Sequence, residues 1–192
     1  MLARLLRILV ISLISVSILA GCGRSNMSPD EALDYFVMQA RNRNLENYRL
    51  VIYAYQPNTH PWLPIRTVRE LRRNAHTTRI VVGSGWLESE FGPWNPDLLN
   101  QIYDTVLVPF EGESNMHPRI YFAFETRWGR QIFDVVMWGN YRNVIVNGVE
   151  VEWNDFFYDI IRPFLPIELV YVMDRSPSRY DHSWPFQVVI PD

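Results

Sequence analysis

Asp134 is the residue whose type and position point most directly to chemistry. It interrupts the apolar run from Ile132 to Trp138, and a carboxylate inside an apolar strand is costly unless it has a partner. One interpretation is a general base or a ligand-binding acid in a cleft lined by a sheet. The other is an ion pair with a cross-strand arginine such as Arg119 or Arg142, or a solvent-facing position. One carboxylate without an evident partner specifies no reaction, so the sequence assigns no catalytic residue.

The four histidines show no pattern that predicts a metal site. None lies at a metal-ligand spacing from another histidine or from a carboxylate, and two of them precede a proline, which is typical of loops. We therefore expect surface or loop positions for His60, His76, His117 and His182. The alternative that stays open is an enzyme, such as a hydrolase, in which Asp134 meets one of these histidines in space.

The absence of lysine removes several common kinds of site. All 18 basic residues are arginine, which excludes a Walker-type phosphate loop and Schiff-base chemistry. Gly83-Ser84-Gly85 follows an apolar run, but position 88 is glutamate, so the dinucleotide-binding fingerprint fails. The net charge of −3 argues against nucleic-acid binding, which needs clustered positive charge. We expect no cofactor, no metal and no nucleic-acid partner.

Two of the seven tryptophans lie where a role in the core is least assured. Trp86 and Trp94 belong to the segment Gly83–Pro96, whose glycines and prolines predict a loop. Exposed tryptophans stack on sugar rings and line apolar ligand pockets, which favours a glycan or a small molecule as ligand. The other interpretation is that they close the core edges of a small sheet domain. The candidate ligand-binding residues are therefore Asp134, Trp86 and Trp94.

The single cysteine, Cys22, ends a segment organised like a secretion signal. Arg4 and Arg7 form a basic start, an apolar run extends from Ile8 to Ala20, and Leu19-Ala20-Gly21 precedes the cysteine. This order resembles the lipobox of bacterial lipoproteins. The resemblance implies cleavage before Cys22, a lipid on its sulfur, and a protein tethered outside the cytoplasm to the cell membrane or the outer membrane.

A retained transmembrane helix is the alternative for this segment. A span needs about 20 mostly apolar residues, whereas the run from Ile8 to Gly23 is shorter and contains three serines. Cleavage would remove residues 1–21 and leave residues 22–28 as the lipidated cysteine and a short tether. The net charge would fall from −3 to −5 because Arg4 and Arg7 are lost. With Cys22 acylated, no thiol is left for a disulfide or a metal.

Residues 29–192 are expected to form one α+β domain, a curved antiparallel β-meander with helices packed on one side. Asn147-Gly148 predicts a type I′ hairpin turn that pairs Val146 with Val149 and Val144 with Val151. The four predicted strands of the meander are Arg119–Thr126, Arg130–Trp138, Arg142–Val146 and Val149–Trp153. Further strands are predicted at Arg49–Tyr55, Arg79–Val82, Thr105–Phe110 and Leu169–Met173, with a strand-like patch at Phe186–Ile190.

Helices are predicted where a capping residue precedes an apolar face. They begin at Ser28, Thr67, Asn95 and Asn154. The first of them, Ser28-Pro29-Asp30-Glu31-Ala32 through Tyr35-Phe36, resembles the first helix of nuclear-transport-factor-two-like domains. That resemblance implies an alternative fold in which a curved sheet shields a ligand cavity. The helix after the meander departs from that family's usual order, in which the long strands come last, so no site residue is carried over.

These patterns together predict a membrane-anchored extracytoplasmic lipoprotein with a binding or accessory role. Its partners would be the membrane, through the lipid, and a small molecule, a glycan or an envelope protein. An envelope enzyme and a purely structural envelope protein stay as alternatives.

The lipobox resemblance generates the first testable prediction. Metabolic labelling with a clickable fatty acid should mark the wild-type protein and should not mark Cys22→Ala, because the cysteine sulfur is the acylated atom. The variant should also lose stable membrane association, since two or more acyl chains are what holds a protein firmly on a bilayer. Equal labelling of both proteins would rule out Cys22 as the anchor.

Overall fold

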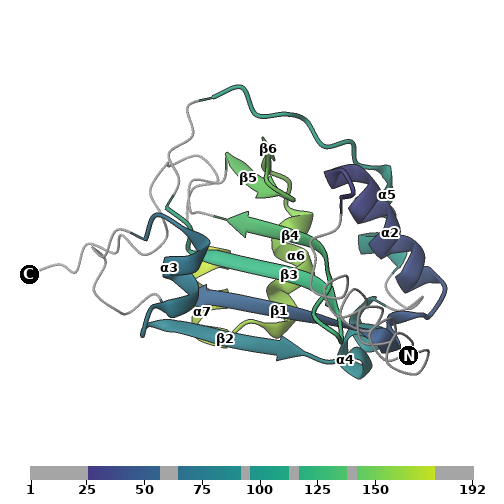
Figure 1. The fold of residues 1–192 in the computed structure, drawn as a ribbon, viewed down its shortest axis with the longest axis horizontal. Coiled ribbons are helices and arrows are strands. Elements are labelled where there is room, and N and C mark those ends of the chain that lie inside the picture. Colours follow the sequence, from purple (N-terminus) through teal and green to yellow (C-terminus); the bar gives the residue numbers. More distant parts are fainter. Residues whose placement is uncertain (1–25, 57–64, 92–95, 113–116, 138–141, 176–192) are drawn as a thin grey trace, which may run out of the picture.

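The computed structural model describes residues 26–56, 65–91, 96–112, 117–137 and 142–175 (Figure 1). Its helices are α2 (Pro29–Arg41), α3 (Val68–Arg73), α4 (Ser84–Phe91), α5 (Pro96–Asp104), α6 (Phe156–Ile161) and α7 (Ile167–Arg175), with 3-10 turns η1 (Leu45–Asn47) and η2 (Arg162–Phe164). Its strands are β1 (Tyr48–Tyr55), β2 (Thr77–Val82), β3 (Ile120–Thr126), β4 (Gln131–Met137), β5 (Asn143–Val146) and β6 (Val149–Glu152). The predicted signal segment with Cys22, and also Trp94, His60, His182 and the patch Phe186–Ile190, lie outside the described residues.

The strands form one antiparallel sheet in the order β2-β1-β3-β4-β5-β6. Its last four strands follow the chain as a meander, and β1 and β2 extend it on the other side of β3 (Figure 1). The prediction of a single α+β domain with an antiparallel meander is confirmed.

The β5–β6 hairpin has the turn and the register that its sequence predicts. Asn147 has a φ of 49° and Gly148 a φ of 82°, the pair of positive values that a type I′ turn requires. Val146 lies opposite Val149, and Val144 lies opposite Val151. Val144, Val146 and Val151 are buried together in the core, so one face of the hairpin turns inward.

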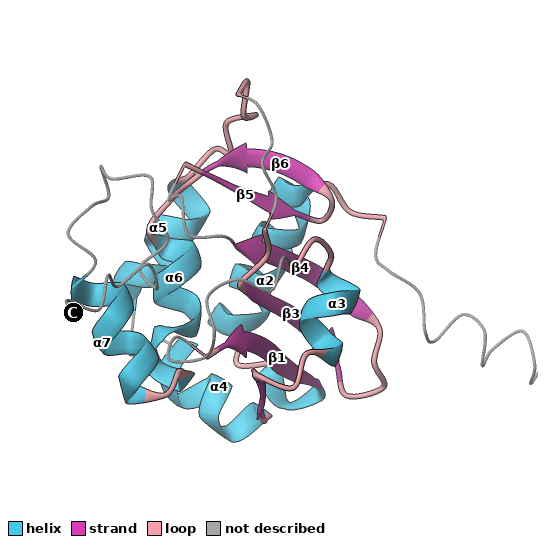
Figure 2. Ribbon diagram, turned by 90° about the vertical axis from the view of Figure 1, so that its left-hand side faces the viewer, coloured by secondary structure: helices cyan, strands magenta, loops and turns pink. Residues whose placement is uncertain are grey.

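The first face of the sheet carries a phenylalanine-rich core. Phe36 of α2 meets Phe91, Phe124 and Phe133 edge-on at centroid distances of 5.4, 4.8 and 5.6 Å. Each fully buried phenylalanine contributes roughly 1.5–3 kcal/mol of transfer free energy, so this cluster is a main source of stability. Helices α2, α4, α5, α6 and α7 all bury apolar residues in the same core (Figure 2).

The second face of the sheet is covered differently. Apart from residues of the strands themselves, the apolar cluster described on that face consists of Val68 and Leu71 of α3 and the neighbouring Ile65 (Figure 2). Five helices pack on the first face, and α3 lies on the opposite face. The cause is local, because Thr67 caps α3 by accepting from the Glu70 N–H at 3.1 Å and so starts a helix whose Leu71 must be buried.

The predicted cap of α2 is confirmed in full. Ser28 accepts from the Glu31 N–H at 3.3 Å, and the Glu31 carboxylate accepts from the Ser28 N–H at 2.8 Å. The predicted cap of α6 at Asn154 is wrong, because the N-cap is Asp155, whose side chain forms no capping hydrogen bond. The Asn154 side-chain oxygen instead accepts from the Phe156 N–H at 3.2 Å, in the turn that precedes the helix. The cap of α5 falls on Asn95, outside the described residues.

Two segments form helices where the sequence predicts otherwise. Part of Gly83–Pro96, predicted as a loop, is helix α4, because Leu87 and Phe91 lie four residues apart and are both buried. Leu169–Met173, predicted as a strand, belongs to helix α7. There Leu169 and Met173 are buried, while Ile167 and Tyr171 are exposed, which is a helical and not an alternating pattern.

The segment Thr105–Phe110, predicted as a buried strand, runs beside β6 without joining the sheet. Val106 and Val108 are 79% and 50% exposed. Glu152 N–H donates to the Val108 carbonyl at 2.8 Å, and a single bridge joins Pro109 to Val151. Proline has no N–H to extend a ladder, so the segment covers the edge of β6 instead of forming a seventh strand.

The hairpin turn generates the second testable prediction. Gly148→Val should lower the free energy of unfolding by about 1–3 kcal/mol, because a β-branched residue is strained at positive φ. Gly83→Val is a matched control, since a Cβ at Gly83 meets no atom within 4 Å and its backbone needs no positive φ. Urea unfolding of both variants measures the difference. A Gly148→Val protein as stable as the control would show that the turn does not constrain the fold.

Candidate functional site

The second face of the sheet carries a row of polar and aromatic residues from three strands, continued by a valine of a fourth. Tyr53 of β1 lies opposite both Arg79 of β2 and Tyr121 of β3, and Tyr121 lies opposite Val136 of β4. Side chains at directly paired positions of an antiparallel sheet share a face, so these residues are neighbours. We call this region the tyrosine–arginine face, and it consists of Tyr53, Tyr55, Tyr121, Arg72, Arg79 and Arg119.

The hydroxyl of Tyr53 is the point on which two arginines converge. Arg79 Nε donates to this oxygen at 3.0 Å, and Arg72 Nη2 donates to it at 3.4 Å. The Arg72 guanidinium also lies 4.9 Å above the Tyr53 ring and 5.9 Å from the Tyr121 ring. The tyrosine rings are buried, whereas Arg72 and Arg79 are exposed, so the arginines form the outer layer of the face.

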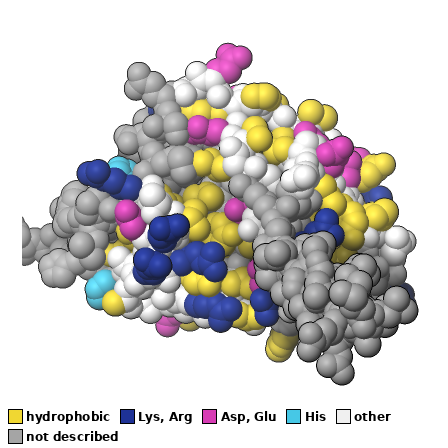
Figure 3. Space-filling model, viewed as in Figure 1, with side chains coloured by type: hydrophobic (Ala, Val, Ile, Leu, Met, Phe, Trp, Pro, Cys, Tyr) yellow, Lys and Arg dark blue, Asp and Glu magenta, His cyan; other side chains and the backbone are white. Residues whose placement is uncertain are grey.

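Helix α3 is what places Arg72 over the tyrosines. Leu71 is fully buried against the second face, so the next residue along the helix is held beside the sheet surface. Arg79 is positioned by its strand alone, because it lies in β2 directly opposite Tyr53 and therefore shares the same face of the sheet. Figure 3 shows arginine side chains gathered over α3 and the adjoining part of the sheet, next to hydrophobic side chains.

The two arginines change the acidity of the phenol. Burial of Tyr53 acts to raise its pKa, but the hydrogen bonds from Arg72 and Arg79 and their positive charges outweigh it. The pKa of Tyr53 is therefore lowered from its ordinary value of 10.0. The result identifies this oxygen as a place where negative charge is stabilised.

A third arginine lies over the neighbouring tyrosine. Arg119 immediately precedes β3, and its guanidinium lies 4.9 Å from the centroid of the Tyr55 ring. Burial lowers the pKa of Arg119, an effect that the nearby Tyr55 only partly opposes. Its Nη1 atom is buried and has no hydrogen-bond partner, and the same holds for Thr77 Oγ1, whose residue lies opposite Tyr55.

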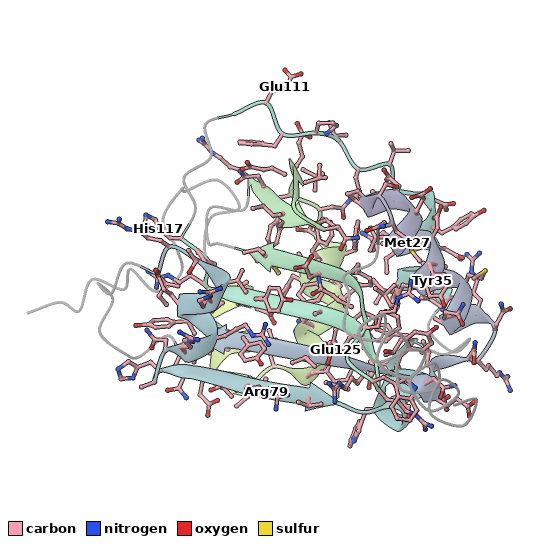
Figure 4. The ribbon with its side chains drawn as sticks, in the orientation of Figure 1. Met27, Tyr35, Arg79, Glu111, His117 and Glu125 are labelled. Atoms are coloured by element: carbon pink, nitrogen blue, oxygen red, sulfur yellow. The ribbon has the colours of Figure 1, made fainter. Side chains whose placement is uncertain are left out.

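A carboxylate does lie near this face, since the charge of Glu125 acts on Arg72. Arg49 forms an ion pair with Glu125 at 2.6 Å in the row toward the right-hand end of the sheet in Figure 4. Among the described residues, Arg72, Arg79 and Arg119 form no such pair. Three guanidinium groups thus surround buried phenols in a chain whose net charge is −3.

Asp134 lies on the second face of the sheet, but in a different row of paired residues from Tyr53 and Tyr121. It is half-buried opposite Ala123, and its main chain exchanges hydrogen bonds with Asn147 at 3.0 Å. His76 lies beyond the other end of β1, where its carbonyl accepts from Gln56 N–H. The register separates Asp134 from His76 by about 17 Å along the strands, and His117 is also at that end (Figure 4). Neither described histidine meets Asp134.

Trp86 does not join Asp134 or the tyrosine–arginine face. It is 68% exposed on the outer side of α4, a helix that packs on the first face of the sheet. Trp94 lies outside the described residues. The three residues singled out by the sequence are therefore not brought into one site within the part of the chain that the structure describes.

Sequence reasoning missed the arginines and tyrosines, although part of the signal is present. Tyr53 and Tyr55 alternate within one predicted strand, and Arg119 and Tyr121 alternate within another, so each pair shares a face. What a single sequence does not supply is that these two strands are neighbours, or that α3 adds Arg72 above them.

In comparisons with known proteins, no family model, no curated protein and no solved structure matches the chain. Among the described residues no group of histidine, cysteine, aspartate or glutamate side chains could hold a metal ion. Nor is any helix in those ranges long and apolar enough to cross a membrane.

The lowered pKa of Tyr53 generates the third testable prediction. A lowered pKa contributes stability that is fully present above the unfolded value near 10.0 and is lost as the pH falls through the folded value. The loss of unfolding free energy in Tyr53→Phe should therefore be larger at alkaline pH than at neutral pH. Urea unfolding at both pH values measures it, and in an Arg72→Gln background the pH-dependent part should shrink. A loss of stability that is independent of pH would contradict this electrostatic account.

Proposed function

We propose that this chain is a lipid-anchored extracytoplasmic protein that binds an anionic ligand on its tyrosine–arginine face. Its role is binding or accessory, without a cofactor. The anchor is Cys22, on the strength of the lipobox pattern that precedes it. The site is supported by the position and charge of the three arginines over the buried tyrosines.

One observation carries the proposal: the guanidinium groups of Arg72 and Arg79 share a single neutral phenol oxygen. The two positive charges that converge on this oxygen repel each other, although water screens part of the repulsion because both side chains are exposed. A phenol accepts hydrogen bonds but neutralises neither charge. An oxyanion placed between the two groups would do both, because guanidinium forks match carboxylate and phosphate oxygens.

The start of the domain is compatible with a site held near the membrane. The Met27 carbonyl accepts from Asn147 Nδ2 at 3.2 Å, which fixes the beginning of the domain on the β5–β6 turn. Residues 23–27 then reach at most about 18 Å when extended. An anchored Cys22 would keep the domain close to the bilayer, where an envelope ligand is encountered.

The proposal generates the fourth testable prediction, for which the chain offers a matched pair of double variants. Arg72→Gln/Arg79→Gln should weaken the binding of inorganic phosphate by about tenfold or more, because charge-assisted hydrogen bonds are lost. Arg69→Gln/Arg73→Gln removes the same charge from exposed positions on α3 that do not contact Tyr53, and it should bind nearly as the wild type does. Isothermal titration calorimetry of the full chain in nonionic detergent and low salt measures both.

The control separates a site from a general charge effect. Equal weakening in both double variants would show that phosphate responds only to net charge. Equal binding by all three proteins, or no binding by the wild type, would overturn the proposed function.

A further inference from the structure

Two buried polar atoms on the tyrosine–arginine face have no partner. Thr77 Oγ1 and Arg119 Nη1 are both inaccessible to solvent and form no hydrogen bond. Native proteins hold very few such atoms, because each forfeits its bonds to water without replacement. Both are on the same face, and they flank one ring: Thr77 lies opposite Tyr55, and the Tyr55 N–H donates to the Arg119 carbonyl at 2.9 Å.

Both residues lie beside Tyr55. The Arg119 guanidinium lies over the Tyr55 ring, at 4.9 Å from its centroid, and Thr77 is paired with Tyr55 in the neighbouring strand. The arginine as a whole is only half-buried, although its Nη1 atom is inaccessible to solvent. Nη1 can only donate, whereas the threonine hydroxyl can donate or accept. A group that forms hydrogen bonds with both atoms would therefore be an oxygen-rich acceptor that lies above Tyr55.

This position is the neighbour of the Arg72–Arg79 position. Arg119 and Tyr121 are two residues apart on the strand that pairs with Tyr53 and Tyr55. Two residues of a strand span about 7 Å. The face therefore presents two cationic positions, one at the Tyr53 hydroxyl and one above Tyr55, at a fixed and short separation.

We infer that the ligand of this face carries two linked oxyanion groups, one held between Arg72 and Arg79 and the other accepting from Arg119 beside Thr77. The inference rests on the proposed function, since it names the class of ligand that the proposed site takes. Linked phosphates and dicarboxylates share this chemistry. A ligand with both groups binds the second one at a high effective concentration once the first is held.

The test compares single and linked anions on the full chain by isothermal titration calorimetry in low salt. The phosphate pair is inorganic phosphate and tripolyphosphate, and the carboxylate pair is acetate and glutarate. In at least one pair the linked anion should bind tenfold or more tightly than the single one, and the pair that shows the gain identifies the source of the oxyanions. No gain in either pair would overturn the inference.

Variants at the second position show whether the gain arises there. Arg119→Gln should abolish most of the gain and leave the binding of the single anion nearly unchanged. Arg127→Gln removes the same charge from the β3–β4 turn, at the other end of the strands, and should keep the gain.

Thr77→Val should reduce the gain without lowering the melting temperature, because the hydroxyl that it removes has no hydrogen bond to lose. The Thr77→Val variant therefore tests the second position even if Arg119→Gln folds poorly. A gain that survives in both Arg119→Gln and Thr77→Val would overturn the inference.

The two proposals fail in different ways. If inorganic phosphate or acetate binds through Arg72 and Arg79 but linkage adds nothing, only the inference about two groups is overturned. If no anion binds in any variant, the proposed function is overturned together with it.

Discussion

The structure depends on one constraint, which is that a single six-stranded sheet has two faces and both must be kept from water. On the first face the alternating residues are phenylalanine and aliphatic side chains, and five helices bury them. On the second face the described residues supply one short helix, and there tyrosines take the place of phenylalanines and arginines cover their rings. A guanidinium plane covers aromatic surface while its charge stays in contact with water, and an aliphatic side chain cannot do both.

This arrangement leaves the positive charges of Arg72, Arg79 and Arg119 without an ion-paired carboxylate among the described residues. The row containing Arg49 shows the ordinary arrangement, in which a carboxylate on the paired strand, Glu125, meets the guanidinium directly. Beyond the row of Val51 and Ala123, the positions facing Arg79 and Arg119 hold Tyr53 and Tyr55 instead. The same face of the sheet thus contains a closed ion pair and, separated from it by one row, a cluster of arginines that form no ion pair among the described residues. The contrast is why we place the ligand over the tyrosines and not over Glu125.

The sequence was most informative where a local rule decides the structure. Asn147-Gly148 determines both the turn and the register of its hairpin, and Ser28 with Glu31 determines the start of α2. It was least informative where distant packing decides. Val170 and Met173 have side chains that suit a strand or a helix, and α7 forms because Leu169 and Met173 pack on the same side of it. The candidate site belongs to the second kind, since it needs β1 beside β3 and α3 above both.

Nuclear magnetic resonance of the arginine Nε–Hε groups tests the central claim most directly, because it reports on each guanidinium separately. During a titration with inorganic phosphate, the signals of Arg72 and Arg79 should shift and saturate together. The signal of Arg162, which is already paired with Asp174 at 2.5 Å, should stay in place. A titration in which Arg72 and Arg79 do not shift, or in which all arginines drift alike without saturation, would contradict a ligand site on the tyrosine–arginine face.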